Sequence, residues 1–251
     1  MPEGTATAQQ WRTFARMLKE DGHGELDRYL YAAGRTFRHV EFARKRVLEV
    51  GSGRGLRTVF MALLGADLVV SMEPELAGSR RGVVALQEAR IRDLGLSNVT
   101  LLKQDFNVWQ PAGREFDVLV SESSINHLFE SPYHALRHTP TYHTYLSICR
   151  KMHAALRSGG VAVITDASRY FFFALAKGAG VKPPWRSKAV SANWRIHQNA
   201  GVWKRILEDA GFSSVSIAYA VPYQMRHLGR LVDNPMGNFL LFGKFLIAAR
   251  S

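Results

Sequence analysis

The beginning of the chain has the pattern of helices. Apolar residues recur there at three- and four-residue spacing, for example Leu26, Tyr29, Leu30, Ala33 and Phe37. This spacing places them along one face of an α-helix. We expect two N-terminal helices, Gln9–Lys19 and roughly Glu25–Arg44, that pack on the part of the chain that follows.

After residue 45 the pattern changes to short apolar runs separated by segments of helix length. The runs that we expect to form strands are Val47–Val50, Asp67–Met72, Val99–Lys103, Phe116–Val120 and Val161–Thr165. Strands that are apolar on both faces are typical of buried, mostly parallel sheets covered by helices. The helices expected beside them are Leu56–Leu64, Glu75–Leu94, Thr141–Leu156 and Gly201–Ala210.

The last two apolar runs, Phe212–Val221 and Asn238–Ala249, have no obvious long helix between them. We expect them to close the sheet, with the final strand a candidate for antiparallel pairing. The whole pattern predicts an α/β fold with a seven-stranded, mostly parallel sheet, helices on both faces and N-terminal helices.

Two segments, 129–140 and 168–198, interrupt the alternation of strands and helices. Both follow the carboxyl ends of expected strands, and that edge of an open α/β sheet holds the ligand crevice. We therefore expect an N-terminal helical segment at 1–45 and a domain at 46–251. Residues 167–200, inserted after the fifth strand, would form a substrate cap.

Composition narrows the protein class. With 251 residues the chain can form one α/β domain with a cap. Its single cysteine, Cys149, excludes an intramolecular disulfide framework and cysteine-based metal clusters. We see no signal-peptide pattern and no apolar stretch near the roughly 20 residues that span a bilayer. We expect a cytoplasmic protein, soluble or at most peripheral to a membrane.

The net charge of +12 suits nucleic acid, an anionic membrane surface, an acidic small substrate or simply a solvated face. Residues 167–206 contain no acid, and their basic residues are Arg169, Lys177, Lys182, Arg186, Lys188, Arg195, Lys204 and Arg205. Three aromatic residues, Phe171–Phe173, lie in the same stretch. They suit ordinary packing, an apolar acceptor or contact with a membrane surface.

A glycine-rich loop, Gly51-Ser-Gly-Arg-Gly55, follows the first expected strand. Glycines permit a tight turn and let a ligand approach the backbone. The second strand ends at Glu73, about twenty residues later, where a carboxylate can accept hydrogen bonds from both ribose hydroxyls. Leu56 stands where an NAD site needs glycine or alanine, and no Gly-Lys-Ser/Thr follows to bind a triphosphate. The loop therefore predicts a nucleoside site of another kind.

These features resemble the class I S-adenosylmethionine (SAM)-dependent methyltransferases, in which an acidic residue precedes a G-x-G-x-G loop. Later landmarks of the family follow in order: Glu73, Gln104-Asp105-Phe106, Phe116–Glu122 and Leu156–Ile164, the last with Ser158 in place of the usual proline. The resemblance is strong over residues 47–166 and looser over 202–249.

The resemblance implies a Rossmann-like fold, SAM as cofactor and S-adenosylhomocysteine as product. The residues that it places at the cofactor are Glu49, Gly51, Ser52, Gly53, Gly55, Glu73, Pro74, Asp105, Phe106 and Ser121. Carboxylates suit a sulfonium cation that carries a neutral adenosine and no phosphate. Glu73 and Asp105 have a second interpretation, as caps of the helices that follow them.

Methyl transfer is an in-line displacement at an activated carbon, so a base is needed only for a hydroxyl or a protonated amine. His127, after the fourth strand, is the leading base candidate, and its alternative role is to fix its loop through hydrogen bonds. Asp166, which ends the fifth strand, would pair with His127, take the proton itself or bond to its own turn. His197 would reach the site only if the cap folds over SAM.

Other chemistry finds less support. His134 and His138 have the i, i+4 spacing of shared metal ligands, but no carboxylate-rich motif accompanies them, and we expect no metal. Ser121-Glu-Ser-Ser replaces the Asn/Asp-Pro-Pro-aromatic motif of amino-methylating DNA enzymes, and nucleic acid is not the favoured partner. The sequence favours methylation of a hydroxyl on a small metabolite, sugar or lipid-like compound. The alternatives are an RNA or protein methyltransferase and a non-catalytic SAM-binding protein.

Overall fold

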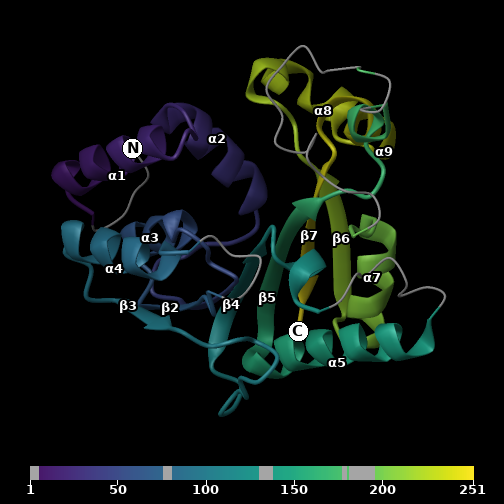
Figure 1. Ribbon diagram of the computed structural model, residues 1–251, viewed down its shortest axis with the longest axis horizontal. Helices are drawn as coiled ribbons and strands as arrows, with labels where there is room; N and C mark the ends of the chain where they lie inside the picture. Colours follow the sequence, from purple (N-terminus) through teal and green to yellow (C-terminus); the bar gives the residue numbers. More distant parts are fainter. Residues whose placement is uncertain (1–5, 76–80, 130–137, 177–179, 181–195) are drawn as a thin grey trace. The chain divides into compact units, whose positions relative to one another are not determined.

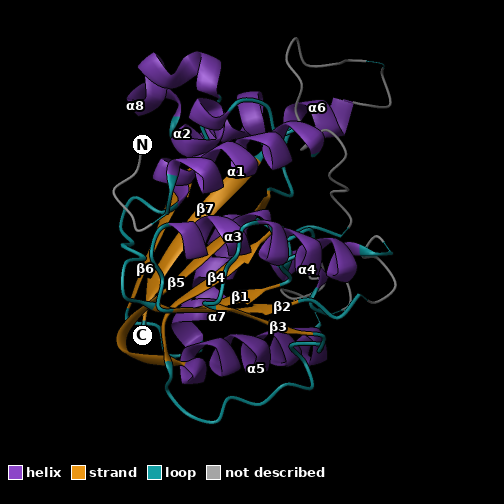
Figure 2. Ribbon diagram, turned by 90° about the vertical axis from the view of Figure 1, so that its left-hand side faces the viewer, coloured by secondary structure: helices purple, strands orange, loops and turns teal. Residues whose placement is uncertain are grey.

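The computed structural model describes residues 6–75, 81–129, 138–176, 180 and 196–251. Its strands form a seven-stranded sheet in the order β3-β2-β1-β4-β5-β7-β6 (Figures 1 and 2). The chain divides into two compact units: unit 1 comprises residues 1–122 and 154–161, and unit 2 comprises 123–153 and 162–251. The α/β fold with a seven-stranded, mostly parallel sheet that the apolar runs predicted is confirmed, and so is the Rossmann-like class that the resemblance implies.

Unit 1 begins with α1 (Ala8–Glu20) and α2 (Leu26–Thr36), which dock on α3 (Leu56–Leu63) through aromatic rings. Phe14 of α1 stacks on Phe60 of α3 with ring centroids 5.8 Å apart. Tyr29 of α2 meets the same ring edge-on at 5.2 Å. The predicted packing of the N-terminal helices is therefore confirmed, with α3 as the helix that receives them.

The second N-terminal helix is shorter than the sequence predicted. α2 ends at Thr36, and the Val40 N–H donates to the Phe37 carbonyl in a turn. Phe37 and Phe42 are both buried and pack edge to face at 4.9 Å. Burial of these two rings is the physical reason that the chain leaves the helix early.

The four strands of unit 1 are β1 (Arg46–Val50), β2 (Leu68–Met72), β3 (Val99–Leu102) and β4 (Phe116–Glu122). All three pairings among them are parallel. The carboxyl ends of β1 and β2 lie side by side, with Val50 opposite Met72. The glycine loop leaves the sheet at this edge.

α4 (Val83–Asp93) is shorter than the helix expected over 75–94. Glu75 has a left-handed backbone with φ 53°, and its carboxylate accepts the N–H groups of Gly82 and Val84. These are N–H groups that a helix start leaves without partners. Glu75 therefore caps α4 instead of belonging to it, and residues 76–80 lie outside the described residues.

Unit 2 is built around the second half of the sheet. Its elements are η1 (Ile125–His127), α5 (Thr139–Ala155), β5 (Leu156–Ala167), α6 (Phe172–Leu175), α7 (Ala200–Asp209), β6 (Ser214–Tyr219) and β7 (Lys244–Arg250), with the first residues of β5 in unit 1. Trp203 of α7 and Tyr145 of α5 are fully buried and meet at 5.0 Å. β6 and β7 pair antiparallel, as predicted for the closing strand.

A helical insertion, residues 223–242, separates β6 from β7. It consists of η5 (Tyr223–Leu228), α8 (Gly229–Val232), α9 (Pro235–Gly237) and η6 (Asn238–Phe242). The prediction of a strand from Asn238 was therefore wrong in its first part. The Asn234 side chain caps α9 by accepting the Gly237 N–H at 2.9 Å, and Gly243 ends η6 with φ 64°. These local signals outweigh the apolar run.

The predicted cap, residues 167–200, lies largely outside the described part of the chain, which here includes 167–176, 180 and 196–200. Within the described segments, none of the helices has the length and apolar character needed to span a membrane.

Candidate functional site

The glycine loop of unit 1 leaves β1 in a left-handed conformation. Gly51, Gly53 and Gly55 have φ values of 72°, 54° and 74°. A Cβ at Gly55 would clash with the Gln87 side chain, whereas a Cβ at Gly53 would meet nothing within 4 Å. Gly55 is therefore required by packing, and the loop is open above Gly53.

Glu73 ties this loop to the end of β2. Its buried carboxylate accepts the N–H groups of Gly53 at 2.7 Å and Glu75 at 3.2 Å. The Ser52 N–H donates to the Met72 carbonyl at 3.0 Å. The capping role considered for Glu73 belongs to Glu75, so the Glu73 carboxylate lies at the edge of the open loop.

Glu49 belongs to a buried polar network beneath the loop. Its carboxyl group bonds to the Thr58 hydroxyl, which lies 3.1 Å from the Ser71 hydroxyl. Ser71 donates to Gln87 Oε1 at 2.6 Å, and Gln87 Nε2 donates to the Gly53 carbonyl at 3.3 Å. The network thus runs from the first strand to the loop backbone.

The Thr58 hydroxyl donates to the Glu49 carboxyl group, and the Ser71 hydroxyl donates to the Gln87 amide oxygen, which can only accept. Glu49 is buried among these neutral partners, where the cost of desolvating a charge favours the neutral acid. Burial raises the pKa of Glu49 to about 8, in agreement with a neutral acid.

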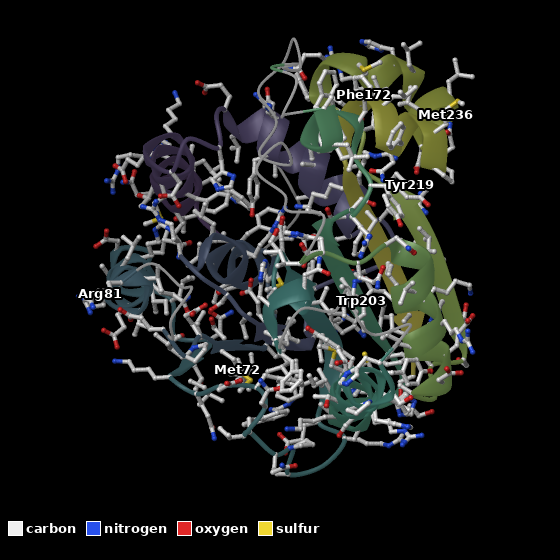
Figure 3. All side chains as sticks on the ribbon, turned by 45° about the vertical axis from the view of Figure 1, so that its right-hand side comes forward. Met72, Arg81, Phe172, Trp203, Tyr219 and Met236 are labelled. Atoms are coloured by element: carbon white, nitrogen blue, oxygen red, sulfur yellow. The ribbon has the colours of Figure 1, made fainter. Side chains whose placement is uncertain are left out.

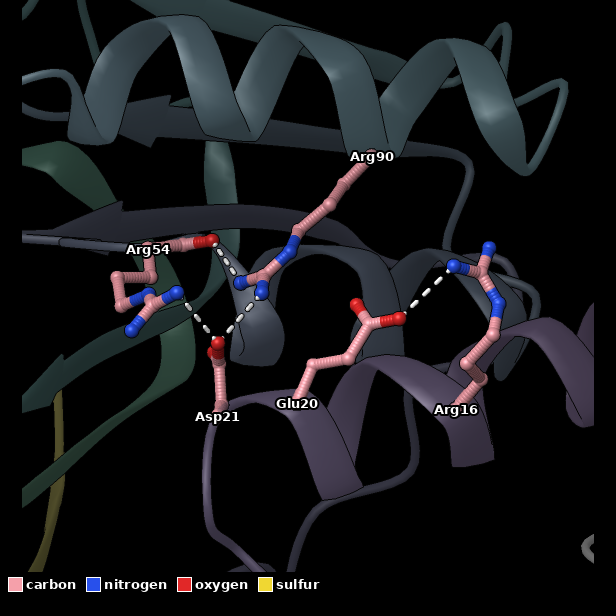
Figure 4. Close-up of polar contacts among 5 residues, drawn as sticks. All are labelled: Arg16, Glu20, Asp21, Arg54 and Arg90. Carbon is pink, nitrogen blue, oxygen red and sulfur yellow. Dashed lines mark hydrogen bonds and ion pairs between the residues drawn. The ribbon is translucent and has the colours of Figure 1, made fainter.

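An ion cluster in unit 1 holds the end of α1 against the loop (Figure 4). The Asp21 carboxylate pairs with Arg54 of the loop at 2.7 Å and Arg90 of α4 at 2.8 Å, and Arg90 also donates to the Arg54 carbonyl at 2.6 Å. The side chains of Asp21 and Arg90 are 1% and 4% exposed, against 59% and 53% for the neighbouring pair Arg16–Glu20. The sequence analysis did not predict this cluster. The sign of it in the sequence was Arg54, because a cation inside the glycine loop calls for an acidic partner.

The remaining cofactor candidates of unit 1 follow its strands. After β3, Asp105 Oδ1 accepts the Asn107 N–H at 2.8 Å, and the buried Phe106 ring stacks on Trp109 at 5.6 Å. Pro74 is half-buried after β2. Ser121 is fully buried on β4.

These residues fit a cationic nucleoside better than a phosphate. The Gly53 N–H, which a phosphate would need, is already bonded to Glu73. Arg54, the cation of the loop, is paired with Asp21. The residues therefore fit the SAM that the resemblance implies: Glu73 would hold the ribose, and Asp105 and Phe106 the adenine. When bound, SAM supplies an electrophilic methyl carbon.

The three residues predicted to act on the acceptor lie together in unit 2. The rings of His127 and His197 meet edge-on with centroids 5.4 Å apart. The buried Asp166 carboxylate accepts the N–H groups of Asn126 at 3.2 Å and Ala167 at 2.6 Å. Asp166 thus holds the turn that carries His127.

Asn126 joins this turn to the segment before α7, and sequence reasoning missed it. Its Oδ1 accepts the Gln198 N–H at 3.0 Å and the Trp203 indole N–H at 3.3 Å. Asn126 is buried, while its neighbour His127 is exposed. The only sign of this role in the sequence was that Asn126, a polar residue, directly precedes the candidate base His127.

The pKa of His127 lies below its usual value. Partial burial of the imidazole lowers the pKa, Asp166 opposes this shift and His197 reinforces it. The imidazole is therefore neutral near pH 7, which is the form that a general base requires.

The other residues singled out in the sequence have ordinary surroundings. His134 lies outside the described residues, and His138 Nδ1 bonds to Thr141 Oγ1 at 2.8 Å. The part of the chain that the structure describes holds no group of three or more potential metal ligands. Cys149 is buried in α5, and burial raises the pKa of its thiol to about 12, so it is unreactive.

Methyltransferases are among the known proteins that this chain resembles. A family model described as a methyltransferase domain matches residues 23–217. The SAM-dependent methyltransferase from Mesorhizobium loti is 17% identical, with a TM-score of 0.60 over 88% of this chain and 97% of that chain. The DhpI-SAM-HEP complex is 16% identical, with a TM-score of 0.54 over 99% of both chains.

The [4+2]-cyclase SpnF has the same fold too, with 15% identity and a TM-score of 0.57 over 90% of this chain and 80% of that chain. No curated protein matches the sequence. The structural likenesses at these identities show the fold, whereas the family model covers most of the chain. The chain belongs to the methyltransferase domain family and is a class I methyltransferase that uses SAM as its cofactor.

Proposed function

We propose that this methyltransferase methylates a hydroxyl group of a small-molecule acceptor, with His127 as the general base. The observation that carries the proposal is the exposed, neutral imidazole of His127 on a turn fixed by Asp166 and Asn126. Along the chain, His127 comes five residues after Glu122, the last residue of β4.

A neutral imidazole suits a hydroxyl acceptor for a simple reason. The hydroxyl must lose its proton as the new O–CH₃ bond forms and the S–CH₃ electron pair returns to sulfur. His127 takes that proton, and the negative charge of Asp166 favours the imidazolium that results. Asp166 and Asn126 hold the turn and thereby the ring position, which is the main protein contribution to a displacement of this kind.

The charge of unit 2 favours an anionic acceptor. Unit 2 contains fifteen Lys and Arg residues against five Asp and Glu, whereas unit 1 contains eighteen against sixteen. A concentration of positive charge raises the local concentration of anionic ligands.

A screen for S-adenosylhomocysteine formation tests the proposal, with hydroxylated metabolites, sugars, lipids and tRNA as acceptors. We expect turnover with a hydroxylated small molecule, and mass spectrometry should place the added methyl on oxygen. Turnover with tRNA alone would refute the proposal. Calorimetry with SAM is the parallel control, because cofactor binding without turnover on any acceptor supports the non-catalytic alternative.

A further inference from the structure

The helical insertion (residues 223–242) and the segment of α6 present an unusual number of apolar side chains to solvent. Ten large apolar side chains are exposed among the described residues, and seven of them lie here: Tyr170, Phe172, Leu175, Leu228, Leu231, Met236 and Leu240. We call these seven the apolar surface. Leu231 and Met236 are 74% and 73% exposed. Single exposed apolar residues are normal, but such a concentration marks an interaction site.

The two segments of the apolar surface adjoin each other within unit 2. The rings of Phe172 and Phe239 meet at 6.2 Å, and the Ser168 N–H donates to the Gly243 carbonyl at 2.8 Å. Figure 3 shows Phe172 and Met236 at the same end of this unit. The exposed side chains therefore belong to one feature.

The polar groups of the insertion hold its backbone rather than cover its apolar side chains. Asp233 accepts the Tyr219 N–H at 2.7 Å, and Asn238 Oδ1 accepts the Lys244 N–H at 2.8 Å. The Arg226 guanidinium is exposed and lies 4.5 Å over the Tyr223 ring. The insertion is thus anchored at its base by two side chains that accept hydrogen bonds from the backbone of β6 and β7.

Charge identifies the partner that fits this surface. Asp233 is the only acidic residue after Asp209, whereas Arg226, Arg230 and Lys244 lie in or beside the insertion. Unit 2 as a whole carries an excess of ten positive charges. Basic residues beside exposed apolar side chains are the combination that binds anionic bilayers. A nucleic acid would not use the apolar side chains, and a second copy would bring the same positive charge.

We propose that the apolar surface docks on an anionic lipid bilayer, with Leu231 and Met236 inserted at the boundary between headgroups and acyl chains. The exposed Arg226 would contact the lipid phosphates. The proposal concerns the surface alone and does not depend on which acceptor the enzyme methylates.

Vesicle co-sedimentation of the full chain tests the proposal. We expect binding to vesicles of phosphatidylcholine and phosphatidylglycerol in equal parts, little binding to phosphatidylcholine alone, and release at high salt. The double substitution Leu231→Asp with Met236→Asp should weaken vesicle affinity about tenfold or more, because two apolar side chains no longer insert. Val108→Asp, at a 66% exposed apolar residue of unit 1, is the matched control and should bind like the unsubstituted protein.

Thermal unfolding of both variants should be unchanged, since all three positions are highly exposed. No binding to the anionic vesicles, or equal loss in the Val108→Asp variant, would overturn the proposal. Two further measurements cover the other partners. If the unsubstituted protein does not bind vesicles but binds RNA or forms a dimer, the double variant should be measured in the same assay. Loss of that property in the double variant would assign the apolar surface to nucleic acid or to a second copy.

Discussion

The two units of this methyltransferase differ in their charge and in the groups that they bury. Unit 1 is nearly neutral and buries its polar chemistry: Asp21, Arg90, Glu49 and Glu73 are all shielded from water. Unit 2 is strongly basic and exposes its candidate base and several large apolar side chains. We infer that binding of the shared cofactor relies on buried, hydrogen-bonded residues, whereas binding of an acceptor relies on exposed residues.

The largest expected effect tests the buried frame of unit 1. Asp21→Asn leaves two arginines without a counter-charge, and breaking a buried ion pair costs about 3–5 kcal/mol. We expect a loss of roughly this size in the free energy of unfolding, measured with urea, together with weaker SAM binding because Arg90 also holds the loop carbonyl.

The matched control for Asp21→Asn is Glu20→Gln on the same helix. Its exposed pair with Arg16 contributes less than about 1 kcal/mol, so this variant should unfold like the unsubstituted protein. Similar losses in the two variants would mean that burial of the cluster has no special importance.

The next effect concerns the exposed turn of unit 2. His127→Ala should lower kcat about a hundredfold, the usual contribution of a general base, and leave SAM affinity unchanged. Stopped-flow kinetics measures kcat and calorimetry measures SAM affinity. The control variant is His143→Ala, which removes another exposed histidine of unit 2. Unchanged turnover would reduce His127 to a structural residue.

The proton on Glu49 gives an effect on stability that grows with pH. Its folded pKa of about 8 lies above the ordinary 4.5, so its contribution to stability is complete below 4.5 and is lost as pH rises through 8. Glu49→Gln keeps an oxygen that can accept from Thr58 but cannot ionise. The unfolding free energy of the unsubstituted protein should fall relative to Glu49→Gln by about 1.4 kcal/mol per pH unit across that window. Parallel pH profiles of the two proteins would show that Glu49 is already ionised.

The smallest effect is a shift in the pH profile of kcat. His197 lowers the pKa of His127, so His197→Asn should raise it and move the acid limb of the profile to higher pH. If the acid limb of the pH profile does not move in this variant, His197 does not influence the pKa of His127. Activity at high pH should change little, because His127 is neutral there in both proteins.

The sequence predicted the parts of the molecule that depend on local pattern. Buried runs such as 47–50 and 116–120 gave the strands, and the glycine loop with Glu73 gave the cofactor class, because periodicity and backbone freedom are local properties. It failed where packing or capping decides. Phe37 leaves its helix to be buried, Glu75 caps a helix, and Asn234 with Gly243 turns an apolar run into helical segments.

The sequence by itself determined the family and the cofactor, since five landmarks in order define a chemistry. Only the tertiary structure decided which contacts the predicted site residues make. It buried Glu49 as the acceptor of the Thr58 hydroxyl, drew Asp21 and Arg90 to the loop from distant helices, and made Asn126 the support of the turn that carries His127. These roles depend on burial and on contacts between segments far apart in the chain, which no local pattern records.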